Sequence, residues 1–183
     1  MIRIRVYRTA SVIVAVLVVG YVGLVYSTIR SADHHLLLIG LLAQSDTDWL
    51  SSQIARYELK RRITTGEFDG VEVLSDLLVV SSSDESVQDI MLGEADSLLN
   101  GSVDVNSYSY SGLTALQIAI INNDPEAVRY LIGHGADPEK VTSVGQNPLQ
   151  FNAIELVYFL EQHFPKQDRS QVIEVLQSAH AGT

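Results

Sequence analysis

One stretch in the second half of the chain limits the fold more than any other. Residues 112–137 read GLTALQIAIINNDPEAVRYLIGHGAD. Thr114 can accept a backbone hydrogen bond at a helix start, so we expect a short helix over residues 115–122. A break at Pro125 leads into a second expected helix over residues 126–133, because proline is tolerated where a helix begins. A helix pair this short cannot bury its own apolar face, so it requires stacked neighbours.

The closing turn completes the pattern. Gly135 can adopt the left-handed backbone conformation that ends the second helix. The stretch resembles an ankyrin repeat, and the positions that match the signature of that family are Gly112, Thr114, Leu116, Ala119, Glu126, Val128, Leu131, Gly135, Ala136 and Asp137. Ala115 stands where the family prefers proline, and Gln117 where it prefers histidine. The resemblance implies a binding scaffold.

Repeats of this family recur at a period of about 33 residues. Asp104 precedes Asp137 by one such period, which indicates that a helix with an apolar stripe from Val87 to Leu99 is the second helix of an earlier, degenerate repeat. Gly145 follows Gly112 by the same interval and marks the start of a third repeat. We therefore expect about three helix pairs.

The outer copies depart from the pattern. Residues 81–84, three serines and Asp84, are expected to form a polar loop and a cap ahead of the helix that ends at Leu99. In the third repeat an apolar run over residues 154–160 arrives about four residues early, so we expect its first helix to shrink to about one turn and the run to be its second helix. A last helix with its buried face between residues 172 and 179 is expected to close the stack.

Residues 10–29 form an uncharged apolar run. At about 1.5 Å per residue, a helix of this length spans roughly 30 Å, the thickness of the hydrocarbon core of a bilayer. Arg3, Arg5 and Arg8 precede the run and Arg30 follows it, so the positive-inside rule places the N-terminus in the cytoplasm. We expect a single-pass anchor in the inner (cytoplasmic) membrane, with the C-terminal domain in the periplasm or otherwise outside the cytoplasm.

Two other interpretations of this run stay open. A cleaved signal peptide would use Val25-Tyr26-Ser27 as its cleavage site, although that site is poor and the run is longer than a usual signal core. An isolated helix in the core of a soluble domain would explain the apolar residues but not the length and the flanking arginines.

The predicted fold is all-α: an N-terminal transmembrane helix followed by a short α-solenoid of about three ankyrin-like helix pairs. The expected parts are a cytoplasmic N-terminus (1–9), the anchor (10–29), a helical linker and N-terminal cap (30–83) and the repeat domain (84–183). Within the linker, helices are expected from about residue 47 to residue 62 and around Val71, Leu74 and Leu78, because their apolar residues recur on one face.

Charge and cysteine content exclude several functions. The net charge is −10, and residues 1–30 hold four arginines and no acid, which leaves a net charge of −14 on the rest of the chain. This acidic body argues against nucleic acid as a partner, since phosphate contacts need lysine and arginine. The absence of cysteine excludes disulfides, zinc–thiolate sites and thiol catalysis.

No set of residues predicts catalysis. His34 and His35 are adjacent and point about 100° apart on a helix, so a solvated pair is favoured over a metal site. His134 belongs to a turn of the repeat, and its position explains it without chemistry. The basic residues from Lys60 to Arg62 suit the end of a helix, with a contact to anionic lipid as the alternative. We expect no catalytic residue, no metal and no cofactor.

The resemblance implies that a protein partner binds to loop tips and to the groove beside the first helices. On this basis the candidate partner-binding residues are Asn106, Tyr108, Tyr110, Gln117, Ile121, Thr142 and Val144. The two tyrosines carry most weight because tyrosine is enriched at binding hot spots. The alternative is that they are turn residues that pack on their own loop.

The acidic body favours a protein partner with a basic surface. The specific hypothesis is an immunity or inhibitor protein against a secreted toxin or phospholipase effector. The alternative is a periplasmic accessory protein that supports an enzyme, for example one in oxidative-stress defence. An enzyme without a recognisable motif is a third interpretation, and no small-molecule substrate is expected.

Overall fold

The structure is a computed structural model that describes residues 20, 22–24, 26–28, 30–42, 49–83, 85–142 and 150–181. All regular elements among these residues are α-helices, which confirms the predicted all-α class for the described part of the chain. The chain divides into two compact units, Met1–Arg61 and Arg62–Thr183.

The first unit contains α2 (His34–Leu42) and most of α3 (Trp49–Thr64). The Asp33 carboxylate accepts a hydrogen bond from the Leu36 N–H group (N···O 2.9 Å) and so caps the start of α2. Small residues allow the two helices to approach closely, because a Cβ atom added at Gly40 would lie 3.1 Å from the Cβ of Ala55. The helix predicted from about residue 47 to residue 62 is confirmed as α3.

The predicted membrane anchor over residues 10–29 falls mostly outside the described residues. Among the residues that are described, no helix has both the length and the apolar character needed to cross a bilayer. The anchor therefore stays a prediction.

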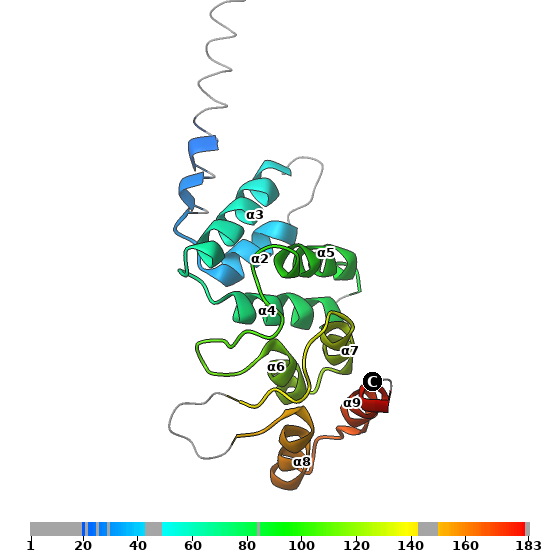
Figure 1. The fold of residues 1–183 in the computed structure, drawn as a ribbon. Coiled ribbons are helices and arrows are strands. Elements are labelled where there is room, and N and C mark those ends of the chain that lie inside the picture. Colours follow the sequence, from blue (N-terminus) through cyan, green and yellow to red (C-terminus); the bar gives the residue numbers. More distant parts are fainter. Residues whose placement is uncertain are drawn as a thin grey trace, which may run out of the picture. The chain divides into compact units, whose positions relative to one another are not determined.

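The second unit contains three stacked helix pairs (Figure 1). These pairs are α4 (Gly70–Ser83) with α5 (Gln88–Leu99), α6 (Ala115–Asn122) with α7 (Pro125–Gly133), and α8 (Ala153–His163) with α9 (Ser170–Ala181). The first helices of the pairs pack on one another in the order α4, α6, α8, and α7 packs on α9. The largest side chains buried in this unit are those of Leu74, Leu77, Leu78, Met91, Leu98, Leu116, Ile120, Leu131 and Leu176.

The middle pair matches its prediction closely. Helix α6 covers the predicted residues, and α7 begins one residue early, at Pro125. The Thr114 hydroxyl accepts from the Gln117 N–H group while the Gln117 side chain accepts from the Thr114 N–H group, so the two form a complete capping box. Gly135 has a φ of +85°, the left-handed conformation predicted for it.

The loop predicted at residues 81–84 is wrong at its three serines, and Asp84 lies outside the described residues. These serines form the last turn of α4, and this helix packs against α5 as the first helix of its pair. The Ser81 hydroxyl donates to the Leu78 carbonyl and the Ser83 hydroxyl to the Val79 carbonyl, so both are satisfied inside the helix. The first pair therefore begins at Gly70, earlier than a strict repeat period places it.

The predicted division of the third repeat is also wrong. Helix α8 packs on α6 and so takes the place of a first helix, while α9 packs on α7 as the second helix. A capping box between Asn152 and Glu155 repeats the box of Thr114 and Gln117, at an interval longer than the repeat period. The third pair thus has two full helices. It begins later than the repeat period predicts because the connection before α8 is longer.

Replacing Gly135 with valine is expected to lower the free energy of unfolding by about 1–2 kcal/mol, because a β-branched residue resists positive φ. A Cβ atom at this position meets no other atom within 4 Å, so backbone strain alone causes the effect. Urea denaturation of the full chain measures it. Gly135→Asn is the control and should lose less, since asparagine tolerates this conformation; equal midpoints for wild type and the valine variant would contradict the assignment.

Candidate protein-binding surface

Three loops that precede the first helices lie next to one another at one edge of the stack. We call residues 65–69, 100–113 and 134–142 together the loop row. Hydrogen bonds join the middle loop to the loop on either side of it. The loops therefore form one continuous surface in which neighbouring loops restrain each other.

Asn106 and Tyr108 join the middle loop to the loop that follows it. The Asn106 side chain donates to the Gly135 carbonyl (N···O 3.0 Å) and accepts from the Asp137 N–H group (2.7 Å). The Tyr108 hydroxyl donates to the Val141 carbonyl (2.8 Å). The Lys140 ammonium lies 4.6 Å from the centre of the Tyr108 ring, a distance at which cation–π attraction is significant.

Tyr110 joins the middle loop to the loop that precedes it. Its N–H group donates to the Asp69 carboxylate (2.5 Å), and its hydroxyl donates to the Gly66 carbonyl (3.0 Å). The other oxygen of the Asp69 carboxylate accepts from the Val71 N–H group (2.9 Å) at the start of α4. Tyr110 is nevertheless 75% exposed, so its ring is both held in place and open to solvent.

A shallow cleft of about 290 Å³ separates the first two loops of the row. Phe68, Tyr108 and Tyr110 supply aromatic surface to it, and Asp69, Asp104 and Ser107 supply oxygen atoms. Aromatic rings with nearby acceptors suit contact with another protein, in which apolar and hydrogen-bonding groups are mixed.

The exposed charges of the loop row are mainly negative. Its exposed acids are Glu67, Asp104, Asp137 and Glu139. Lys140, the lysine of the loop row, is half-buried, and its ammonium group contacts the Tyr108 ring. Asp104 and Asp137 each also accept a backbone N–H group within their own turn, which fixes the direction of these carboxylates. The row thus presents fixed negative charge.

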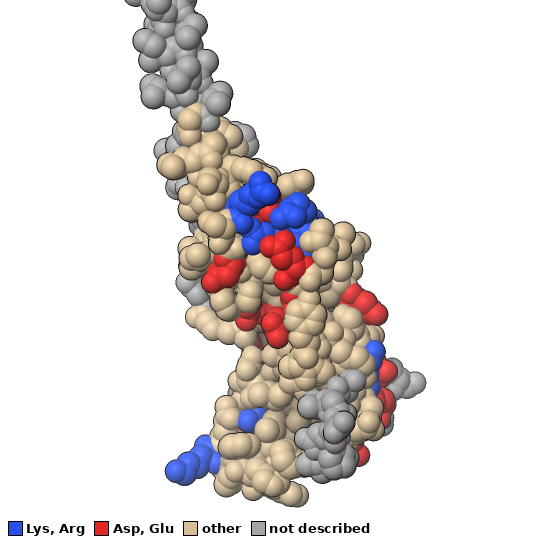
Figure 2. Space-filling view, turned by 90° about the vertical axis from the view of Figure 1, so that its left-hand side faces the viewer, with Lys and Arg blue, Asp and Glu red and all other residues tan. Residues whose placement is uncertain are grey.

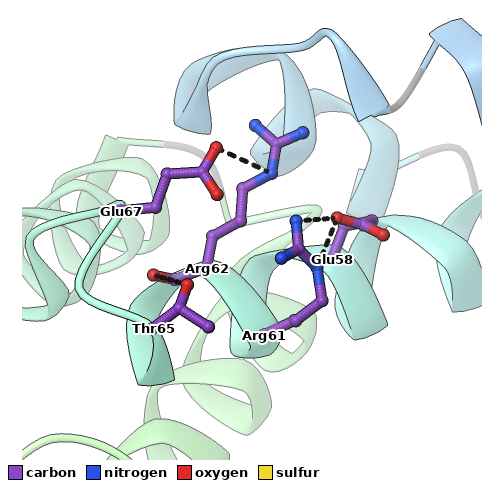
Figure 3. A network of polar contacts seen from close by, with 5 residues as sticks. All are labelled: Glu58, Arg61, Arg62, Thr65 and Glu67. Carbon is purple, nitrogen blue, oxygen red and sulfur yellow. Dashed lines mark hydrogen bonds and ion pairs between the residues drawn. The ribbon is translucent and has the colours of Figure 1, made fainter.

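Figure 2 shows basic side chains gathered on one part of the surface, with acidic side chains among them. Figure 3 shows that Arg61 makes two hydrogen bonds to one oxygen of the buried Glu58 (3.0 and 2.9 Å). In the second unit, the Nε atom of Arg62 lies 3.6 Å from the Glu67 carboxylate, and its guanidinium group lies 5.1 Å from the centre of the Phe68 ring. Both arginines are therefore engaged by groups of their own chain.

The structure separates the predicted partner-binding residues into groups. Tyr108 and Tyr110 lie exposed in the loop row, and Ile121 lies 38% exposed at the end of α6. Asn106 is half-buried and links two loops. Val144 lies outside the described residues. The binding role of all five stays a prediction.

Gln117 and Thr142 instead have structural roles. Gln117 is 1% exposed, and its side chain donates to the carbonyls of Lys140 and Phe151 (2.9 and 3.3 Å). Thr142 is also buried, and its hydroxyl accepts from the Phe151 N–H group (3.2 Å). A partner cannot reach either side chain, because both are buried. Gln117 ties α6 to the last loop of the row, and Thr142 ties that loop to the segment before α8.

Sequence comparison agrees with this arrangement. The family model described as "Ankyrin repeats (3 copies)" matches residues 79–163, which run from the end of α4 to the end of α8. No curated protein matches the chain. The stacked pairs, the capping box of the middle pair and this match lead to one conclusion: residues 79–163 form ankyrin repeats.

Proposed function

We propose that the loop row binds a protein partner, with Tyr110 as its main anchor. Ankyrin repeats form protein–protein interaction modules and are typically scaffolds without enzymatic activity. The observation that carries the proposal is that Tyr110 is largely exposed although both its backbone and its hydroxyl are held by the preceding loop. A ring fixed before binding loses little entropy when a partner covers it.

The partner carries a basic surface around the residue that meets Tyr110. The exposed carboxylates of Glu67 and Asp104 are placed near the cleft, and Asp137 and Glu139 extend the negative charge along the row. Complementary charge speeds association and disfavours acidic competitors. Binding is therefore expected to weaken as salt concentration rises.

Replacing Tyr110 with alanine is expected to weaken partner binding at least about tenfold, which corresponds to about 1.4 kcal/mol. The measurement is retention of the product of the adjacent gene by the purified full chain, compared with wild type. Tyr158→Ala is the matched control, since Tyr158 is an exposed tyrosine on α8, outside the loop row. Equal loss in both variants, or none in the first, would exclude the loop row as the binding surface.

A more specific proposal concerns location. The uncharged run over residues 10–29, with arginines mainly on its N-terminal side, supports an anchor in the inner membrane and a repeat domain outside the cytoplasm. Alkaline phosphatase fused to the C-terminus is active only outside the cytoplasm, so it tests the orientation. A cleaved signal peptide would give the same activity but would release the fusion from the membrane fraction.

The biological role proposed is that of an immunity or inhibitor protein, held at the membrane, which blocks a secreted toxin or phospholipase effector. The exposed tyrosines and the fixed carboxylates support it, because inhibitors need rigid complementary surfaces. Co-expression with the toxin encoded nearby should restore growth, and Tyr110→Ala should abolish this protection. If neither binding nor protection occurs, this role is rejected.

The alternative role is an accessory protein that supports an enzyme outside the cytoplasm, such as one in oxidative-stress defence. The two roles differ in a cell that contains no toxin. Deletion of the gene should then leave an inhibitor without effect but lower the activity of the supported enzyme, measured in extracts of wild-type and deletion strains under peroxide stress.

A further inference from the structure

The second helices of the first two pairs, α5 and α7, are packed less closely on each other than α7 is on α9. They meet near one end, where the Tyr130 hydroxyl donates to the Asp96 carboxylate (2.5 Å) and the Nε2 atom of His134 lies 3.1 Å from the same oxygen. Burial, followed by this hydrogen bond, raises the pKa of the Tyr130 phenol, so the ring stays neutral and donates.

This looser packing leaves an open groove of about 250 Å³. Leu78, Leu92 and Ala127 supply apolar surface to it, and Gln88, Tyr130 and Gly133 are among the other residues that line it. None of the lining residues belongs to the loop row. The groove is therefore a second surface, separate from the one proposed to bind the partner through Tyr110.

The size of the groove selects the kind of occupant. Its volume is below the range of about 300–1,000 Å³ that is usual for small-molecule sites. Much of its lining is apolar and offers water molecules few hydrogen bonds. One large apolar side chain, presented by another polypeptide, fits both the volume and the lining.

The charges around the groove select a basic occupant. The exposed acids on the second helices are Asp89, Asp96, Glu126 and Glu174, whereas Arg129 is the exposed arginine on the same described helices. Arg129 already pairs with Glu126 (2.7 Å). Ser81 and Ser82, which also line the groove, lie in the last turn of α4, and the C-terminal end of a helix carries partial negative charge.

From these observations we propose that the groove between α5 and α7 is a second protein-binding site. Its ligand is an amphipathic helix of a partner protein that inserts one leucine or phenylalanine and surrounds it with lysine or arginine. Helices commonly bind in this way, with an apolar residue in a groove and charged residues at the rim. The chain would then bridge two proteins, one at the loop row and one at the groove.

The probe is a fluorescent synthetic helix of about five turns with leucine on one face and lysine on the other. Its binding to the full chain is measured by fluorescence anisotropy. Gly133→Leu adds a large side chain to the lining of the groove, and the fold can accept it because a Cβ atom at Gly133 meets no atom within 4 Å. Gly93→Leu is the matched control, since Gly93 is a helical glycine of α5 with the same free space but does not line the groove.

We expect Gly133→Leu to weaken binding of the leucine–lysine helix at least about tenfold, and Gly93→Leu and Tyr110→Ala to change it less than about twofold. Peptides with alanine in place of leucine, or glutamate in place of lysine, should bind at least about tenfold more weakly than the probe. The proposal is overturned if Gly133→Leu binds like wild type, or if the alanine peptide binds as tightly as the leucine peptide. The Tyr110→Ala result keeps this test separate from that of the loop row.

Discussion

Replacing Gln117 with alanine is expected to lower the free energy of unfolding by about 2–4 kcal/mol, more than a surface substitution can. The side chain makes three hydrogen bonds: it accepts from the Thr114 N–H group (2.9 Å) and donates to the carbonyls of Lys140 and Phe151. Alanine removes all three hydrogen bonds at a buried position and leaves a cavity. Urea denaturation of the full chain should show a lower midpoint with an unchanged slope.

Glu155→Ala is the matched control for this prediction. Glu155 has the same place in the capping box of α8, where it accepts from the Asn152 N–H group (3.0 Å), but it is exposed and makes no contact comparable to the bridge from Gln117 to two carbonyls. Its loss should lower stability by about 1 kcal/mol. Equal effects of the two substitutions would show that the cap, and not the bridge to the last loop, is what Gln117 supplies.

The role of Gln117 also shows what local patterns can and cannot predict. Its place three residues after Thr114 predicts a capping box, and the structure contains it. Its bonds to Lys140 and Phe151 depend on a chain segment 23 and 34 residues away, which no local pattern describes. The resemblance alone therefore assigned Gln117 to a binding surface, although tertiary contacts bury its side chain.

The third helix pair shows a similar limit. The glycine spacing of the repeat predicts a start at Gly145, whereas α8 begins after Asn152. Asn152 and Glu155 have the spacing of a capping box, a signal present in the sequence that competes with the period. The period is reliable where the connections keep their length, as in the middle pair. It fails where the connection before α8 is longer.

The loop row shows the same limit at the candidate site. Tyr108 and Tyr110 could be identified from residue type and position in the repeat, but the groups that hold Tyr110, which are Gly66 and Asp69, could not. Asp69 precedes α4 and is a residue type that commonly caps helices, so the sequence could have indicated its role as a cap. Its second bond, to the backbone of Tyr110, spans 41 residues and is a product of the stack.

Asp69→Ala is therefore expected to affect both stability and binding. Loss of the cap on Val71 costs about 1 kcal/mol, and the Tyr110 N–H group that loses its acceptor adds about 1–3 kcal/mol, a total of about 2–4 kcal/mol. Asp104→Ala is the matched control, because Asp104 is an exposed aspartate of the same surface whose carboxylate accepts from the Asn106 N–H group within its own turn. It should lower stability by no more than about 1 kcal/mol.

The binding experiment distinguishes a positioning role of Asp69 from a purely structural one. At a temperature where the Asp69→Ala variant remains folded, partner binding should fall as it does for Tyr110→Ala, and the double variant should bind no more weakly than Tyr110→Ala, since both changes remove the same held ring. Asp69→Asn retains one acceptor oxygen for the cap and should recover stability more than binding. Independent, additive losses would mean that Asp69 does not act through Tyr110, and that the exposed ring binds without being fixed beforehand.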